Sequence, residues 1–107
     1  MDYPIQVILC TCPDRVVAEQ LARRLINEQL AACVNIVPNL LSIYSWQGKV
    51  ESAEECLLLI KAPMSQYDLI ENTLHEQHPY EVPEIIALPV QQGLPEYLQW
   101  IHACIKK

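Results

Sequence analysis

The sequence predicts an α+β fold with one antiparallel sheet, and three observations support this fold class. Short runs of apolar and β-branched residues alternate with segments in which apolar residues recur at helical spacing. Two of the strand-like runs are separated by Gln47 and Gly48, which indicates a hairpin turn. The 107 residues suffice for one hydrophobic core, so residues 1–107 are expected to form a single domain.

The first predicted elements are a buried strand and an amphipathic helix. Residues 5–11 form a short apolar run, and Pro13 and Asp14 behind it are typical of a helix start. Apolar residues at helical spacing then continue through residues 14–29, which predicts a helix with one core-facing side.

The hairpin follows over residues 33–46 and 49–62. Pro38 cannot donate a hydrogen bond to a neighbouring strand, so the first arm is expected at the edge of the sheet with a bend or bulge at this position. Residues 56–60 are apolar without polar alternation, which is typical of a central strand covered on both faces.

A second helix, a fourth strand and a closing helix complete the chain. Apolar residues at helical spacing follow Pro63, and Pro79 must end the helix that they predict. Residues 84–90 predict a strand, and residues 95–105 predict a helix. The order βαββαβ plus a C-terminal helix is that of a ferredoxin-like split βαβ sandwich.

The composition indicates that the domain self-associates. Apolar residues make up 51% of the chain, which leaves few polar residues for the surface of a small monomer. One face of the predicted sheet is larger than a single C-terminal helix can cover, and the hairpin arms exceed the ~5–6 residues of a usual strand. We therefore expect another copy of the chain to cover this face and to pack against the hairpin tip at residues 44–49.

The charge and the segment pattern exclude several classes of partner. A formal net charge of -6 with 7 scattered Lys and Arg residues argues against nucleic acid and anionic membranes. No apolar run approaches the roughly 18 residues of a membrane span, and residues 1–4 lack the basic region of a signal peptide. Five cysteines without an export signal favour free thiols in a reducing compartment, so we expect a cytoplasmic protein.

Two pairs of residues are candidate metal ligands. Cys10 and Cys12 are two positions apart on a strand, so both side chains point to one face, where they can share a soft ion or pack as small buried hydrophobes. Cys12 also precedes a helix start, where backbone amides favour a thiolate. His75 and His78 are three positions apart at the end of the second helix, a spacing that suits joint metal binding. The alternative is an exposed His75 and a His78 that caps the helix end.

Catalytic motifs are missing from the sequence. It contains no Gly-rich phosphate loop, no Gly-x-Ser-x-Gly elbow and no His-Glu-x-x-His motif, and two glycines are too few for a phosphate cradle of backbone amides. We therefore expect a protein that is not an enzyme.

Five segments resemble the CutA family of divalent-cation-tolerance proteins, in order and at matching spacing. They are TCPD at 11–14, LAACVNI at 30–36, SIYSWQGK at 42–49, HPYEVPEI at 78–85 and YLQWI at 97–101. The resemblance implies a ferredoxin-like subunit in a homotrimer, cytoplasmic in bacteria and linked to tolerance of copper and other divalent metals. It also implies a copper ligand at Cys10. Family members that bind copper can carry two adjacent histidines before Pro-Tyr, whereas here Gln77 precedes His78.

Three hypotheses of function follow. The first is a cytoplasmic homotrimer that binds Cu²⁺ or a related divalent ion through Cys10, His78 and either Cys12 or His75. The second is a trimeric scaffold similar to the nitrogen-signalling trimers, which senses a small molecule or binds a protein in clefts between subunits around Lys61, Tyr80 and Glu84. The third is a redox protein or enzyme that uses Cys12.

Overall fold

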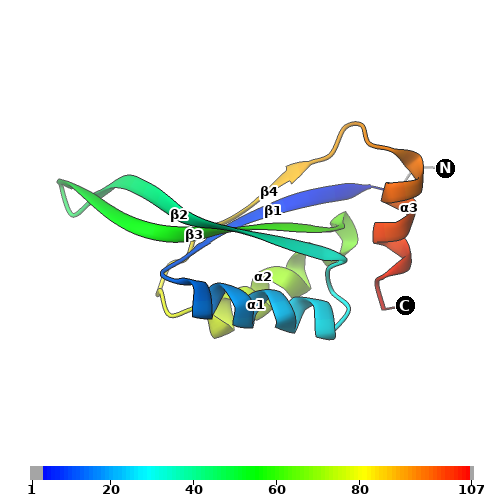
Figure 1. The fold of residues 1–107 in the computed structure, drawn as a ribbon, viewed down its shortest axis with the longest axis horizontal. Coiled ribbons are helices and arrows are strands. Elements are labelled where there is room, and N and C mark those ends of the chain that lie inside the picture. The colour runs from blue at the N-terminus through cyan, green and yellow to red at the C-terminus, as the bar shows by residue number, and fades with distance from the viewer. Residues whose placement is uncertain (1–3, 107) are drawn as a thin grey trace.

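The fold is α+β and contains the predicted elements in the predicted order. The computed structural model describes residues 4–106 (Figure 1). Its elements are β1 (Ile5–Cys12), α1 (Arg15–Asn27), β2 (Cys33–Trp46), β3 (Lys49–Pro63), a 3-10 turn η1 (Met64–Gln66), α2 (Tyr67–Gln77), β4 (Ile85–Pro89) and α3 (Pro95–Ala103). Asp14 lies just outside α1 and accepts a hydrogen bond from the Val17 amide, so it caps the helix that the sequence predicts from this position.

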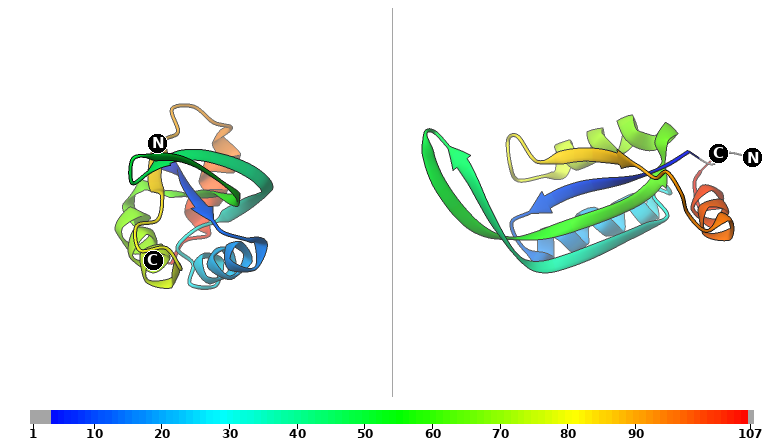
Figure 2. Two further views of the ribbon diagram at one scale, coloured as in Figure 1. Left: turned by 90° about the vertical axis from the view of Figure 1, so that its left-hand side faces the viewer. Right: turned by 90° about the horizontal axis from the view of Figure 1, so that it is seen from above.

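All four strands form one antiparallel sheet in the order β2-β3-β1-β4. Helices α1 and α2 lie side by side against one face of the sheet, and α3 stands at the end away from the hairpin tip (Figures 1 and 2). The predicted antiparallel ferredoxin-like sandwich is therefore confirmed. Within residues 4–106, no helix combines the length and the hydropathy that a membrane-spanning helix requires.

The core lies between the sheet and the two helices. Successive strand residues point to opposite faces, so Ile8, Cys10 and Cys12 of β1 face the helices. Leu58 and Ile60 of β3 lie beside them in register, and both are fully buried. Residues 56, 58 and 60 of the apolar run predicted for a central strand thus lie in the core, whereas Leu57 and Leu59 point to the opposite face, where they are only partly buried.

The hairpin of β2 and β3 extends well beyond the rest of the sheet (Figure 2, right). Its pairing shifts register between Val37 and Leu40, so that Pro38 and Asn39 form a bulge, and Asn39 takes a positive φ of 60°. This confirms the bend that Pro38 predicts. At the tip, Gln47 and Gly48 have φ values of 49° and 78°, the two positive values that a type I′ turn requires.

Replacing Gly48 by alanine is expected to lower the free energy of unfolding by about 1 kcal/mol. The cost arises from the left-handed backbone and not from crowding, because a Cβ at this position meets no atom within 4 Å. Gly48→Asn is the matched control and is expected to cost less, since asparagine tolerates positive φ. Urea unfolding of both variants measures the difference, and an equal loss in both would contradict this explanation.

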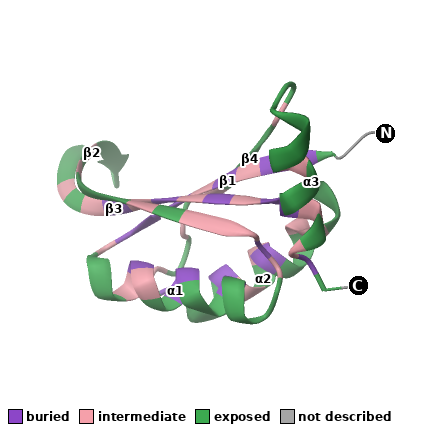
Figure 3. Cartoon of the chain, turned by 45° about the vertical axis from the view of Figure 1, so that its right-hand side comes forward, coloured by how far each residue is buried: buried purple, intermediate pink, exposed green. Residues whose placement is uncertain are grey.

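The opposite face of the sheet is largely uncovered (Figure 3). Ile101 of α3 and Ile5 of β1 are buried where α3 meets the end of the sheet. Further along, apolar residues remain half-buried or exposed on this face, among them Val7, Leu9, Leu57, Leu59, Ile86 and Leu88. In agreement with the sequence prediction, α3 leaves most of this apolar face open.

Candidate metal centre

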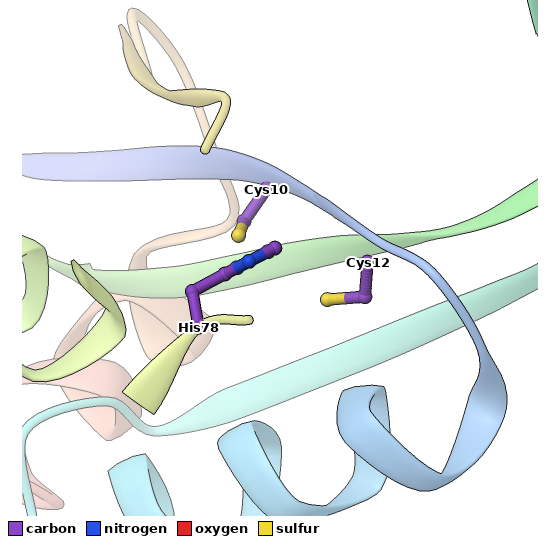
Figure 4. A group of neighbouring side chains, drawn as sticks. All are labelled: Cys10, Cys12 and His78. Atoms are coloured by element: carbon purple, nitrogen blue, oxygen red, sulfur yellow. The ribbon is translucent and has the colours of Figure 1, made fainter. Parts of the chain in front are cut away.

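Three of the four predicted metal ligands lie together on the helix-facing side of the sheet. Cys10, Cys12 and His78 each present a ligand atom, and these atoms all lie within 4.8 Å of one another. The imidazole ring points toward the two sulfur atoms from below the sheet (Figure 4). Both cysteines are fully buried, and His78 is 8% exposed.

Local rules of strand and helix geometry place these three side chains. The two-residue period of β1 sends both cysteines to the helix-facing side. Pro79 prevents α2 from continuing, so the helix ends at Gln77 and His78 takes an extended conformation with φ -77° and ψ 138°. The His78 amide still donates to the Leu74 carbonyl, while its side chain leaves the helix surface and enters the core.

Both ring nitrogens of His78 have hydrogen-bond partners. The Tyr80 amide donates to Nδ1 over 3.1 Å, and Nε2 lies 2.8 Å from the Thr11 carbonyl oxygen. Because a backbone amide can only donate, Nδ1 is unprotonated, and because a carbonyl can only accept, Nε2 carries the proton. His78 is therefore a neutral imidazole with a defined tautomer.

The two thiols are coupled to each other. A hydrogen bond from the Cys10 thiol to Cys12 raises the pKa of Cys10 and lowers the pKa of Cys12, while burial raises both. Cys56 lies opposite Cys12 in the β1–β3 register, and its pKa is raised first by burial and then by the charge of Cys12. Of the two thiols, Cys12 is therefore the one that loses its proton more readily, while burial opposes a charge on either.

Tyr80, in the loop that follows α2, contacts both His78 and strand β3. Its hydroxyl donates to Glu55 Oε2 of β3 over 2.9 Å, and its ring lies 4.7 Å from the His78 ring between centroids. Burial, followed by the hydrogen bond to Glu55, raises the pKa of Tyr80. The sequence carries no signal for this contact, because 25 positions separate the two residues.

The other candidate residues lie outside this group. His75 is exposed on α2, where its Nε2 lies 3.2 Å from the Glu81 carbonyl oxygen. Lys61 is paired with Val7 on the open face of the sheet, and its ammonium group donates to Asn35 Oδ1. Glu84 is exposed next to the start of β4. Within one chain, Lys61 and Tyr80 lie near different parts of β3, because Tyr80 is bonded to Glu55.

The donor set has the chemistry of a site for soft or borderline metal ions. Two sulfur atoms and an imidazole nitrogen make up the group, which contains no carboxylate. Thiolate and imidazole ligands suit copper and zinc, whereas magnesium and calcium require oxygen ligands. A metal-ligating histidine usually has one ring N–H bonded to a carbonyl or carboxylate, and the contact of His78 with the Thr11 carbonyl is a hydrogen bond of this kind. The residues present therefore fit a thiophilic ion.

The chain is similar to proteins that are named for metal tolerance. The family described as "CutA1 divalent ion tolerance protein" matches residues 6–104. The divalent-cation tolerance protein CutA of Thermus thermophilus is 48% identical over 97 residues, which cover 91% of this chain and 94% of that protein. Protein CutA of Mus musculus is 45% identical over 98 residues, or 92% of this chain. The chain spans only 55% of the mouse protein's length.

Solved structures agree with the sequence matches. The structure titled "Periplasmic divalent cation tolerance protein CutA" from Archaeoglobus fulgidus superposes with a TM-score of 0.93 at 35% identity. The match covers 95% of this chain and 99% of that chain. Likeness in fold and sequence thus extends over nearly the whole length of the described residues.

Proposed function

Because the chain belongs to the CutA1 family of divalent ion tolerance proteins, we propose that it acts in metal ion tolerance by binding copper(II) or a related divalent ion. The proposed ligands are Cys10, Cys12 and His78. The observation that supports them is the meeting of two buried thiols and a neutral imidazole within 4.8 Å. His75 is the remaining candidate from the sequence. It lies outside this group, and its Nε2 is within hydrogen-bonding distance of the Glu81 carbonyl oxygen.

Loss of one of the three ligands is expected to weaken copper binding by about 100-fold or more, since even residues that only orient a ligand contribute about 10- to 100-fold. The experiment is a copper titration of the wild type and of Cys10→Ser, Cys12→Ser and His78→Ala. His75→Ala is the matched control and is expected to keep the wild-type affinity. Unchanged affinity and stoichiometry in all three ligand variants would refute the metal site, and a comparable loss in His75→Ala would add that residue to it.

We further propose that the protein is a homotrimer whose subunits cover the open face of the sheet. Leu9 and Leu59 lie side by side on this face, within a wider apolar surface that a monomer would leave in water. The exposed tryptophan of the hairpin, Trp46, offers a further contact beyond the sheet.

Leu59→Glu is expected to dissociate the trimer, because the new carboxylate would be buried without a partner in the interface. Light scattering should give the mass of three chains for the wild type and of one chain for this variant. Val16→Glu, on the exposed side of α1, is the control and should remain trimeric. A wild-type protein with the mass of one chain at micromolar concentration would exclude the trimer.

We also propose that the protein resides in the cytoplasm and that it binds its ligand without acting as an enzyme. The name of the Thermus thermophilus relative describes tolerance of divalent cations and not a reaction, and the five free thiols suit a reducing compartment. Recovery of the native protein in a periplasmic fraction would contradict this compartment. Thermal stabilisation by small metabolites, without stabilisation by copper, would instead favour a trimeric sensing scaffold.

A further inference from the structure

Cys12 and Cys56 are direct partners in the antiparallel ladder of β1 and β3. Residues that face each other in such a ladder point to the same side of the sheet, with Cα atoms about 4.5–5.5 Å apart. A disulfide requires a Cα separation of about 4.4–6.8 Å, so the pairing brings the two thiols within reach of each other. Both cysteines are free thiols in the structure.

The pair lies at the end of the ladder and at the edge of the core. Cys12 is the last residue of β1, so its side chain can approach Cys56 without disturbing the pairing of the rest of the strand. Cys12 is fully buried and Cys56 is 5% exposed, but Asp14 and Glu54, two positions along the chain from each, are exposed to solvent. A small oxidant therefore needs only a local movement of the chain to reach the two sulfur atoms.

We propose that Cys12 and Cys56 form a reversible cross-strand disulfide in the presence of hydrogen peroxide, and that this bond removes Cys12 from the metal-binding group, a consequence that rests on the proposed function. One sulfur attacks a peroxide oxygen, which breaks the O–O bond and gives a sulfenic acid and one water. The other sulfur then displaces the sulfenic oxygen as a second water, and the sulfur–sulfur bond forms. The two thiols together lose two electrons and two protons, which the peroxide gains.

The position of Cys12 in both pairs connects the disulfide to metal binding. The thiolate is the form of cysteine that binds a metal, so a disulfide at Cys12 leaves the group with Cys10 and His78 as donors. Cys10 is a poorer disulfide partner for Cys12 than Cys56 is. Two positions along one strand separate Cα atoms by about 6.4–6.8 Å, which is at the upper limit for a disulfide.

The disulfide is tested on the metal-free protein in the presence of a chelator. Treatment with hydrogen peroxide, alkylation of the remaining thiols and peptide mapping by mass spectrometry should give peptides linked through Cys12 and Cys56, and a thiol reductant should separate them. Cys33→Ala removes a half-buried thiol outside this pair and is the matched control, which should give the same link. A link between Cys12 and Cys10, or unmodified Cys12 and Cys56 when Cys33 of the wild type is oxidised, would overturn the inference.

The consequence for the metal group is tested with Zn²⁺, which suits thiolate and imidazole ligands and has no redox chemistry of its own. Peroxide is expected to weaken Zn²⁺ binding by the wild type about 100-fold, as loss of a ligand would, and the reductant should restore it. Cys56→Ala keeps the three proposed ligands and should bind Zn²⁺ equally well before and after peroxide. Weaker binding by oxidised Cys56→Ala, or unchanged binding by wild type that carries the disulfide, would overturn the link to metal binding. No Zn²⁺ binding by the reduced protein would contradict the proposed metal site and leave the disulfide standing.

Discussion

Replacing His78 by alanine is expected to lower the free energy of unfolding by about 3 kcal/mol, even when a chelator keeps the protein free of metal. The imidazole is buried, and its removal deprives the Tyr80 amide of its acceptor on Nδ1 and the Thr11 carbonyl of the shorter of its two side-chain contacts, the other being the Cys10 thiol. The side chain also leaves a cavity beside Cys10 and Cys12. Urea unfolding at one fixed protein concentration measures the effect, since subunit association would make stability depend on concentration.

His75→Ala is the control for this experiment. His75 is exposed and has one hydrogen bond, to the Glu81 carbonyl, so its removal is expected to change the free energy of unfolding by no more than about 0.5 kcal/mol. Similar losses in the two variants would show that the buried hydrogen bonds of His78 do not stabilise the fold.

A second large effect is expected at Leu58, where substitution by alanine should lower the free energy of unfolding by about 3–5 kcal/mol. Leu58 is fully buried at the centre of β3, paired with Cys10 on one side and with Ile36 on the other. Its neighbours belong to a continuous sheet and cannot close the cavity without breaking strand pairing. Leu69→Ala removes the same atoms from an exposed position on α2, 53% accessible to solvent, and should cost less than about 1 kcal/mol.

The two leucine variants are compared by calorimetry or urea unfolding under the same conditions. A loss below about 1 kcal/mol in Leu58→Ala would mean that the core repacks around the missing side chain, contrary to the close packing of the helix-facing side. Because Leu58 also supports Cys10, the same variant is expected to weaken copper binding, whereas Leu69→Ala is not.

The elements of the fold could be predicted from the sequence because their signals are local. The alternation of residues in β1 predicted that Cys10 and Cys12 share a face, and Pro38 predicted the bulge in the edge strand. The relation between the histidines could not be predicted in this way. Helical spacing places His75 and His78 on one side of a helix, but α2 ends at Gln77, and the extended backbone at His78 turns its ring into the core.

The contacts that complete the site also depend on distant parts of the chain. His78 meets the Thr11 carbonyl across 67 positions, and Tyr80 meets Glu55 across 25. No periodicity within a segment reports which carbonyl or carboxylate a loop will meet. These contacts follow from the antiparallel order of the strands, which brings the end of β1 and the middle of β3 to the loop after α2.

The bulge at Pro38 and Asn39 has a consequence for how copies of the chain can join. A long apolar strand at the edge of a sheet is a template on which further chains can stack without limit, as they do in amyloid fibres. In β2, Pro38 lacks an amide proton and Asn39 breaks the pleat, so an incoming strand cannot form an unbroken ladder along this edge. The interruption therefore favours closed assembly over fibre growth in a chain that is rich in exposed apolar residues.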